Sequence, residues 1–351
     1  MVKYFEFSKY SYNFVKIFNR MKVHFPILVL LLTLCIPTKA QNVVDKLFLD
    51  MRSSFHQEIS RGGSYDSQLV GEYLNFHILG HITPTIDYRI RQRLNKKVFD
   101  EKNMFNATDF MYINWQATPK LSFMVGKQAV LIGGYEYDAV PIDVYFYSKF
   151  CENLYQGFTF GASATYQVAP MQNIVFQVCN SPLSLGFQSV YAYNLAWSGR
   201  FAPWWHTIWS VNFVEDTDKH MANYISLGNH FTFNNIIFDI DIMNRAGFGQ
   251  KKFFLSDITL ISKFIWSVGK WNICAKAGYE VNSPDNVDAN GRAYDIVIAP
   301  GTQYIYAGAG LEWFPLGRDN ARLHLVWYGD NAMKRHNIEL GVTWRIDIIN
   351  R

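Results

Sequence analysis

Three arginines at every second position are the residues whose spacing most clearly indicates chemistry. They are Arg89, Arg91 and Arg93. If this segment is a β-strand, all three side chains lie on one face, about 7 Å apart. A planar guanidinium group donates two hydrogen bonds at once, which suits phosphate and similar anions. The spacing therefore predicts a ladder of weak anion sites, provided that this face of the strand lines a water-filled channel.

Other basic residues extend the ladder if their strands face the same way. They are Lys127, Lys276, Arg322 and Arg345. Strict alternation places Lys127 with Phe123 and Val125, but it lies at the end of its strand, where a loop begins. The alternative interpretation is a solvated interior with balanced charges, which would only tune ion selectivity. The acids that alternation places in the same interior are Asp50, Asp87, Asp239, Asp241, Glu280, Glu339 and Asp347.

Patterns that indicate enzymatic or metal chemistry are weak. The histidines are scattered along the chain, and no GxSxG, HExxH or GxxxxGK[ST] motif occurs. Asp216, Asp218 and His220 share one segment, but an exposed polar loop explains them more simply than a metal site. We therefore predict no catalytic residues, no cofactor and no metal site. An outer-membrane hydrolase, a protease or lipase, remains the enzymatic alternative.

Residues 129–154 form a long connection without a repeating period. A connection of this length inside an ordered β protein is usually functional or disordered. This one is too aromatic to be a solvated linker, so it needs a surface to pack against. We predict that it folds into the mouth or lumen of a barrel and narrows the pore. Its candidate site residues are Tyr135, Glu136, Asp138, Asp143 and Lys149.

The elements that position these residues follow from a period of two. Apolar and polar residues alternate in segments of about ten residues, the length that a tilted membrane-spanning strand needs. In residues 236–242, isoleucine or phenylalanine occupies the even positions and aspartate occupies 239 and 241. We count about sixteen such segments, joined alternately by short turns, often with proline, and by longer polar loops. This pattern predicts an all-β fold, a transmembrane antiparallel β-barrel of about 16 strands with an inward-folded constriction loop.

The sequence of a soluble β-sandwich would show the same alternation. The start of the chain and the composition therefore have to distinguish a sandwich from a membrane barrel. Aromatic residues make up 17% of the 351 residues. Lys22 precedes an apolar run from Phe25 to Ile36, and Ala40 ends a small-residue cleavage site. We expect residues 1–40 to be a signal peptide, with Met21 as a second candidate start, and residues 41–351 to form the barrel. Both features favour a barrel in the outer membrane.

The charge of the exported chain is close to neutral. Residues 1–40 carry six basic residues and one acid, so their removal leaves 27 basic and 28 acidic residues. A global basic field, which nucleic-acid binding would need, is therefore absent. We expect no nucleic-acid partner.

The segment Phe123-Met-Val-Gly-Lys-Gln128, followed by Gly133-Gly134-Tyr135-Glu136, resembles the phosphate-selective porins O and P, as found in Bacteroidetes-type bacteria. Residues 108–117 and 341–346 are also similar to that family. The resemblance covers residues 41–351. It implies a sixteen-stranded homotrimeric porin of the Gram-negative outer membrane, whose third long loop folds inward.

Two features depart from the family pattern. Arginines and lysines that line the lumen give the family its anion selectivity, yet here the loop acids outnumber Lys149. These acids are Glu136, Asp138, Asp143 and Glu152. The chain also ends in Arg351, without the terminal aromatic residue that is typical of bacterial barrels.

These observations predict an outer-membrane porin for passive diffusion of small hydrophilic solutes, with anion or phosphate preference through the arginine ladder. Its partners would be those solutes or anions and the lipid of the outer membrane. The alternative is a substrate-specific binding or uptake barrel, in which Tyr135, Tyr137 and Tyr145 form a stacking surface for sugars. Saturable binding of one solute would distinguish this class from a general pore.

Overall fold

The computed structural model describes residues 43–60, 62–95, 104–184, 189–318, 320–332 and 336–351. The chain divides into two units, Met1–Val43 and Val44–Arg351, and the second contains all of the strands described below. The expected signal peptide, residues 1–40 with the candidate start Met21, lies outside the described residues. None of the helices in the described part of the chain is both long enough and apolar enough to span a membrane.

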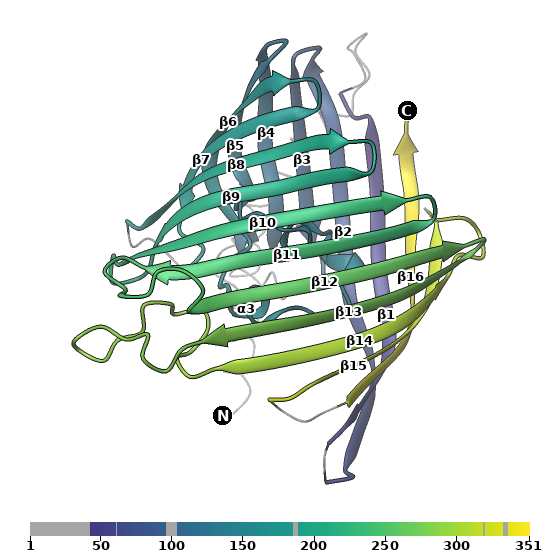
Figure 1. Ribbon diagram of the computed structural model, residues 1–351. Coiled ribbons are helices and arrows are strands. Elements are labelled where there is room, and N and C mark those ends of the chain that lie inside the picture. Colours follow the sequence, from purple (N-terminus) through teal and green to yellow (C-terminus); the bar gives the residue numbers. More distant parts are fainter. Residues whose placement is uncertain (1–42, 61, 96–103, 185–188, 319, 333–335) are drawn as a thin grey trace, which may run out of the picture. The chain divides into compact units, whose positions relative to one another are not determined.

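Sixteen antiparallel strands close into a barrel, in which each strand pairs with its neighbours in sequence and the last strand pairs with the first (Figure 1). This confirms the predicted all-β fold, an antiparallel β-barrel of about 16 strands. The strands are β1 (Lys46–Ile59), β2 (Tyr65–Thr83), β3 (Ile86–Arg93), β4 (Thr108–Thr118), β5 (Leu121–Ala129), β6 (Phe158–Ala169), β7 (Gln172–Asn180), β8 (Tyr191–Ala202), β9 (Trp205–Glu215), β10 (Met221–Phe233), β11 (Ile236–Gly247), β12 (Asp257–Val268), β13 (Trp271–Asn282), β14 (Gln303–Trp313), β15 (Ala321–Asp330) and β16 (His336–Asn350). Closure pairs both edges of the sheet, which a β-structure in lipid requires because no water is there to satisfy the backbone.

Short and long connections alternate along the chain, as predicted. Six of the connections contain two residues each, among them Pro84-Thr85, Pro170-Met171 and Asn234-Asn235. Met171 and Asn234 have φ angles of 60° and 51°, as tight hairpin turns require. The longest connections are residues 130–157, between β5 and β6, and residues 283–302, between β13 and β14.

The two faces of the wall differ in chemistry. On β15, Leu323, Leu325 and Trp327 are exposed on the outer face, whereas His324 and Val326 between them are buried. Trp271 and Trp313 stack on the outer face with their ring centroids 5.8 Å apart, next to the short turns. An apolar outer band with tryptophans near its border is the surface that an outer-membrane barrel presents to lipid.

The apolar core of the molecule lies between the two long connections and one side of the wall. Val130, Ile132 and Phe150 of the first connection pack with Val297 and Ile298 of the second. The wall contributes residues of β7 to β11 to the same cluster, namely Cys179, Ala192, Val214, Ala222, Tyr224 and Met243. The long connections are therefore packed structures and not solvated loops.

Candidate functional site

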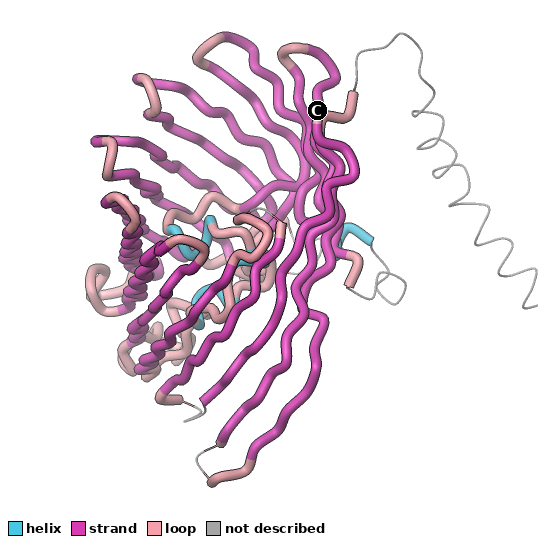
Figure 2. The backbone as a smooth tube through the Cα atoms, turned by 90° about the vertical axis from the view of Figure 1, so that its right-hand side faces the viewer, coloured by secondary structure: helices cyan, strands magenta, loops and turns pink. Residues whose placement is uncertain are grey.

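The connection between β5 and β6, residues 130–157, contains the five candidate site residues of the predicted constriction loop; we call it the β5–β6 segment. It includes the short helices α2 (Tyr135–Asp138), η2 (Pro141–Asp143) and α3 (Lys149–Asn153). Its hydrogen bonds reach side chains of β1, β7, β9, β10, β11, β13, β14 and β15. All of these wall side chains alternate with the apolar outer residues. Figure 1 and Figure 2 show α3 and the neighbouring loops surrounded by the strands.

Two wall carboxylates hold the starts of the two α-helices. The oxygens of Asp241 accept hydrogen bonds from the backbone N–H groups of Tyr135 and Glu136, both at 2.8 Å. Glu280 accepts in the same way from the N–H groups of Lys149 and Phe150, at 2.6 and 3.0 Å. The first N–H groups of a helix have no partner within the helix, and bonds from them to a charged acceptor are strong. Asp241 and Glu280 are therefore anchors of the segment.

A glycine makes the first of these contacts possible. Gly134, immediately before α2, has a φ of 121°, which side chains of L-residues rarely tolerate. A Cβ atom at this position would also lie 3.3 Å from the carboxyl group of Asp241. Glycine thus lets the backbone turn into the helix while it approaches the wall closely.

Two wall arginines hold the middle of the segment by its carbonyl groups. Arg52 donates from Nη1 to the carbonyl oxygens of Ile142 and Val144, at 3.0 and 2.9 Å. Arg322 donates to the same Ile142 carbonyl at 3.2 Å and forms an ion pair with Asp143 at 2.9 Å. The structure thus brings two predicted site residues together, Arg322 from the ladder and Asp143 from the loop.

A buried ion pair joins α2 to β13. Lys276 Nζ lies 2.6 Å from Glu136 Oε2, and the other oxygen of Glu136 accepts from the Ser148 N–H at 2.7 Å. Burial alone would raise the pKa of Glu136, but the Lys276 ammonium and the Ser148 N–H outweigh it and lower that pKa below its usual value. Glu136 therefore stays charged, and its pairing stabilises the docked segment.

This ion pair predicts the chemical reactivity of Cys151 on α3. Burial raises the pKa of the Cys151 thiol well above its ordinary value, so the docked thiol should react slowly with maleimides. Lys276→Met leaves the Glu136 carboxylate buried without its partner, which is strongly destabilising. In a Cys179→Ser, Cys274→Ser background, we expect this change to accelerate Cys151 labelling by about tenfold or more.

The matched control for this labelling experiment is Lys149→Met. Lys149 lies on the same segment, but its partner Glu152 is partly exposed, 2.6 Å away. Because an exposed pair contributes little to stability, the labelling rate should stay close to that of the parent. Equal acceleration by both substitutions would show that the Glu136–Lys276 pair is not what holds the segment.

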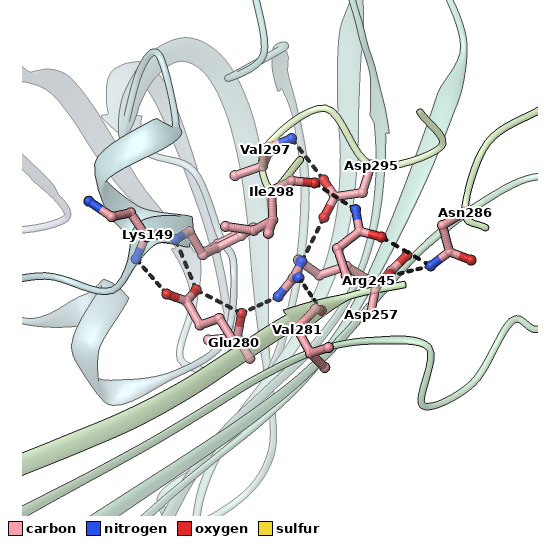
Figure 3. A network of polar contacts seen from close by, with 12 residues as sticks. Lys149, Arg245, Asp257, Glu280, Val281, Asn286, Asp295, Val297 and Ile298 are labelled. Carbon is pink, nitrogen blue, oxygen red and sulfur yellow. Dashed lines mark hydrogen bonds and ion pairs between the residues drawn. The ribbon is translucent and has the colours of Figure 1, made fainter. Parts of the chain in front are cut away.

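The second long connection, residues 283–302, is linked to one of these anchors, Glu280 (Figure 3). Arg245, fully buried, forms an ion pair with Asp295 at 2.7 Å and also bonds to Thr259. Thr259 donates to Glu280 at 3.0 Å, the carboxylate that holds α3. Asn153 Nδ2 donates directly to the Val297 carbonyl at 2.7 Å. The two connections therefore form one packed unit.

The three arginines of the predicted ladder share one strand but not one environment. Arg91 and Arg93 both form ion pairs with Asp109, at 2.9 and 2.5 Å, and Arg91 is buried. The Arg89 guanidinium lies over the Phe110 ring at 4.3 Å and forms no ion pair with any residue that the structure describes. Sequence reasoning did not consider Asp109, which lies at an irregularity in the β3–β4 register and so escapes the alternating pattern.

The structure corrects the predicted pore-lining role of Lys127. It pairs in register with Met111 and Phe160, and Phe160 is exposed on the outer face. Lys127 Nζ donates at 2.5 Å to the carbonyl oxygen of Phe105, in the 3₁₀ helix η1 (Met104–Ala107). The physical reason is strict strand alternation, which continues to the end of β5.

The remaining candidates line the inner side. The Arg345 guanidinium lies 4.4 Å from the Phe48 ring centroid, and Tyr135 stacks on His230 with centroids 5.1 Å apart. Burial raises the pKa of Asp138, which favours its neutral form.

A cavity of about 390 Å³ remains between the β5–β6 segment and strands β11 to β15. Both charge signs line it, with acids and bases facing one another. The charged lining residues are Glu136, Asp143, Asp239, Asp241, Glu312, Lys263, Lys276, Arg318 and Arg322. Such a lining suits small, hydrated, polar solutes.

Comparisons with known proteins agree with this architecture. Residues 70–232 match the family model described as phosphate-selective porin O and P, which confirms the resemblance found in the sequence. No curated protein matches the chain.

Solved structures with the same fold include three outer-membrane proteins at low identity. The outer membrane channel DcaP of Acinetobacter baumannii has a TM-score of 0.62 at 8% identity, covering 88% of this chain and 99% of that one. The loop L8 deletion mutant of Vibrio cholerae OmpT has a TM-score of 0.58 at 11% identity, covering 86% and 99%. The anion-selective porin from Comamonas acidovorans has a TM-score of 0.56 at 9% identity, covering 86% and 98%. These similarities concern the fold.

Proposed function

We propose that this chain, which carries the sequence features of the phosphate-selective porin O and P family in residues 70–232, is a porin of the Gram-negative outer membrane. It conducts small hydrophilic solutes down their gradients, without a cofactor and without catalysis. The closed sixteen-stranded barrel with an apolar outer face carries this proposal. Residues 1–40 would direct export and be removed, and outer-membrane lipid would surround the wall.

The β5–β6 segment narrows the pore in this proposal. Its hydrogen-bond partners on the wall come from eight strands, so it extends across much of the lumen and not along a single strand. A constriction built from packed side chains sets the size limit of a pore, and the charges that border it set the preferred sign of the ion. Strand β3, which is not among these eight strands, carries Arg89 and the two arginines that pair with Asp109 of β4.

An anion preference is the finer part of the proposal. The sequence alone argues against an anion preference, because the segment contains more acidic than basic residues. Three of these acids, however, face a base: Glu136 pairs with Lys276, Asp143 with Arg322 and Glu152 with Lys149. The acidic charge of the segment is therefore largely compensated. Of the three arginines on β3, Arg89 is the one without an ion pair among the described residues. One solved protein of similar fold is titled an anion-selective porin, which supports this preference.

Single-channel recording tests the function. We expect the folded chain to give steady ohmic steps in a planar bilayer in potassium chloride, and added phosphate to reduce the step size through competition at the arginine sites. Steps that phosphate does not affect would leave a general porin and contradict the phosphate site. A folded barrel that gives no steps would contradict the porin proposal itself.

A substrate-specific uptake barrel is the second candidate, because the 390 Å³ cavity is large enough for a small solute. Saturation of flux by one solute would favour it over a general pore. A homotrimer is the assembly that we propose for either function, and a solved OmpT structure of similar fold is titled a trimer form. Crosslinking of the native membrane protein would show the number of chains.

A further inference from the structure

Three side chains with metal-binding atoms meet where the first and last strands pair. They are His56 of β1, Glu72 of β2 and Glu339 of β16. His56 Nε2 lies 3.3 Å from Glu72 Oε1 and 3.1 Å from Glu339 Oε1. The three potential ligand atoms all lie within 4.8 Å of one another. This cluster is separate from the arginine ladder and from the 390 Å³ cavity.

Hydrogen bonds alone do not satisfy this cluster. One imidazole nitrogen carries at most one proton, yet His56 Nε2 faces two carboxylates. Glu339 is 1% exposed, and its Oε1 also accepts from the Tyr328 hydroxyl at 3.0 Å. Its Oε2 is buried and has no hydrogen-bond partner among the described residues. A buried carboxylate oxygen without a partner is costly, and a bound cation would remove that cost.

The spacing and the ligand types fit a tetrahedral transition-metal ion. Bonds of about 2.0 to 2.2 Å around such an ion separate neighbouring ligand atoms by about 3.3 to 3.6 Å. One histidine nitrogen and two carboxylate oxygens leave a fourth position for water, as zinc sites of the open type do. Calcium needs six to eight oxygen ligands, which this cluster does not supply. We propose that His56, Glu72 and Glu339 bind one divalent transition-metal ion such as Zn²⁺.

Neighbouring groups orient these ligands and leave an entry path. Arg52 Nε holds the other oxygen of Glu72, and Tyr328 holds Glu339, so both carboxylates are oriented by a second contact. The His56 side chain is 30% exposed, which gives an ion access from the lumen. When His56 is neutral, the formal charges of Glu72, Glu339 and Arg52 add up to one negative charge. This net charge favours the binding of a cation. The sequence predicted no metal site because ligands at positions 56, 72 and 339 form no local motif.

The test measures zinc binding to the full chain, folded in detergent and freed of metal with a chelator. Competition with a chromophoric zinc indicator should show one zinc ion per wild-type chain. His56→Gln and Glu339→Gln should each weaken binding by at least about tenfold. Zinc should also raise the unfolding temperature of the wild-type chain but not of these variants. His81→Gln is the matched control, because His81 on β2 contacts the single carboxylate of Asp45.

Several outcomes would overturn the site. The site is excluded if the wild-type chain binds no zinc. It is also excluded if either substituted chain binds zinc as tightly as the wild type does. Binding of calcium in preference to zinc excludes the transition-metal assignment. Glu72→Gln gives a further variant if one of the others fails to fold, and the heat-dependent mobility shift of folded barrels in gels shows which variants are folded.

Discussion

Replacing residues 130–157 with a four-residue turn is expected to raise the single-channel conductance by about twofold or more, since it removes the segment that we propose as the main constriction. The design is feasible because Ala129 and Phe158, which flank the segment, pair directly in the β5–β6 register. A short hairpin can therefore join them without moving either strand. The wall anchors that lose their partners would then face a wider, water-filled lumen.

A milder variant tests whether the anchors, and not merely the presence of the segment, set the conductance. Asp241→Ala with Glu280→Ala removes the carboxylates that hold α2 and α3. We expect larger and noisier open-channel currents, because the segment can then leave the wall. Glu152→Gln removes an acid from the same segment without removing an anchor, and its currents should match the wild type. An unchanged conductance in the deletion variant would mean that the segment does not constrict the pore.

Substituting Arg89 with alanine should shift the reversal potential in a potassium chloride gradient toward cation selectivity, by on the order of 10 mV. Arg89 is expected to dominate the ladder because it has no carboxylate partner among the described residues. Arg91→Ala should have a smaller effect, since the Arg91 guanidinium is already paired with Asp109. Replacing Arg89, Arg91 and Arg93 together should give the largest shift.

Asp109→Asn separates local charge from general damage to the barrel. It removes the acid that pairs with Arg91 and Arg93, so anion selectivity should increase while the strand keeps its three arginines. If the reversal potential stays the same in all of these variants, the three arginines only balance other charges of the lumen and do not set the ion selectivity.

The fold could be predicted from the sequence because strand structure is local. Alternation of apolar and polar residues, together with turns such as Pro84-Thr85, specifies strand positions without knowledge of distant contacts. The same local rule, applied strictly, also predicts that Lys127 faces outward. The inward orientation that we expected for Lys127 at the end of β5 does not occur, because the alternation continues through that position.

The candidate site could be predicted only in part, because its contacts cross the lumen. Arg322 and Ile142 are 180 positions apart, and no local pattern indicates that they meet. Asp241 and Glu280 were correctly placed on the inner face, but their role as helix anchors depends on where α2 and α3 lie. The alternation of charged and apolar residues shows which side chains face inward. Which residues these side chains bind depends on how the β5–β6 segment packs, and the alternation does not show that.

The pairing of β1 with β16 has a consequence for the order in which the chain folds. Ile59 pairs with His336, so the two edges of the sheet can meet only after almost the whole chain has been synthesised and delivered to the membrane. Contacts between such distant positions form slowly, because chain entropy opposes them. The carbonyl oxygen of Ile142 accepts hydrogen bonds from Arg52 of β1 and from Arg322 of β15, on either side of that late junction. The β5–β6 segment thus bridges the two ends of the sheet across that junction through a single carbonyl group.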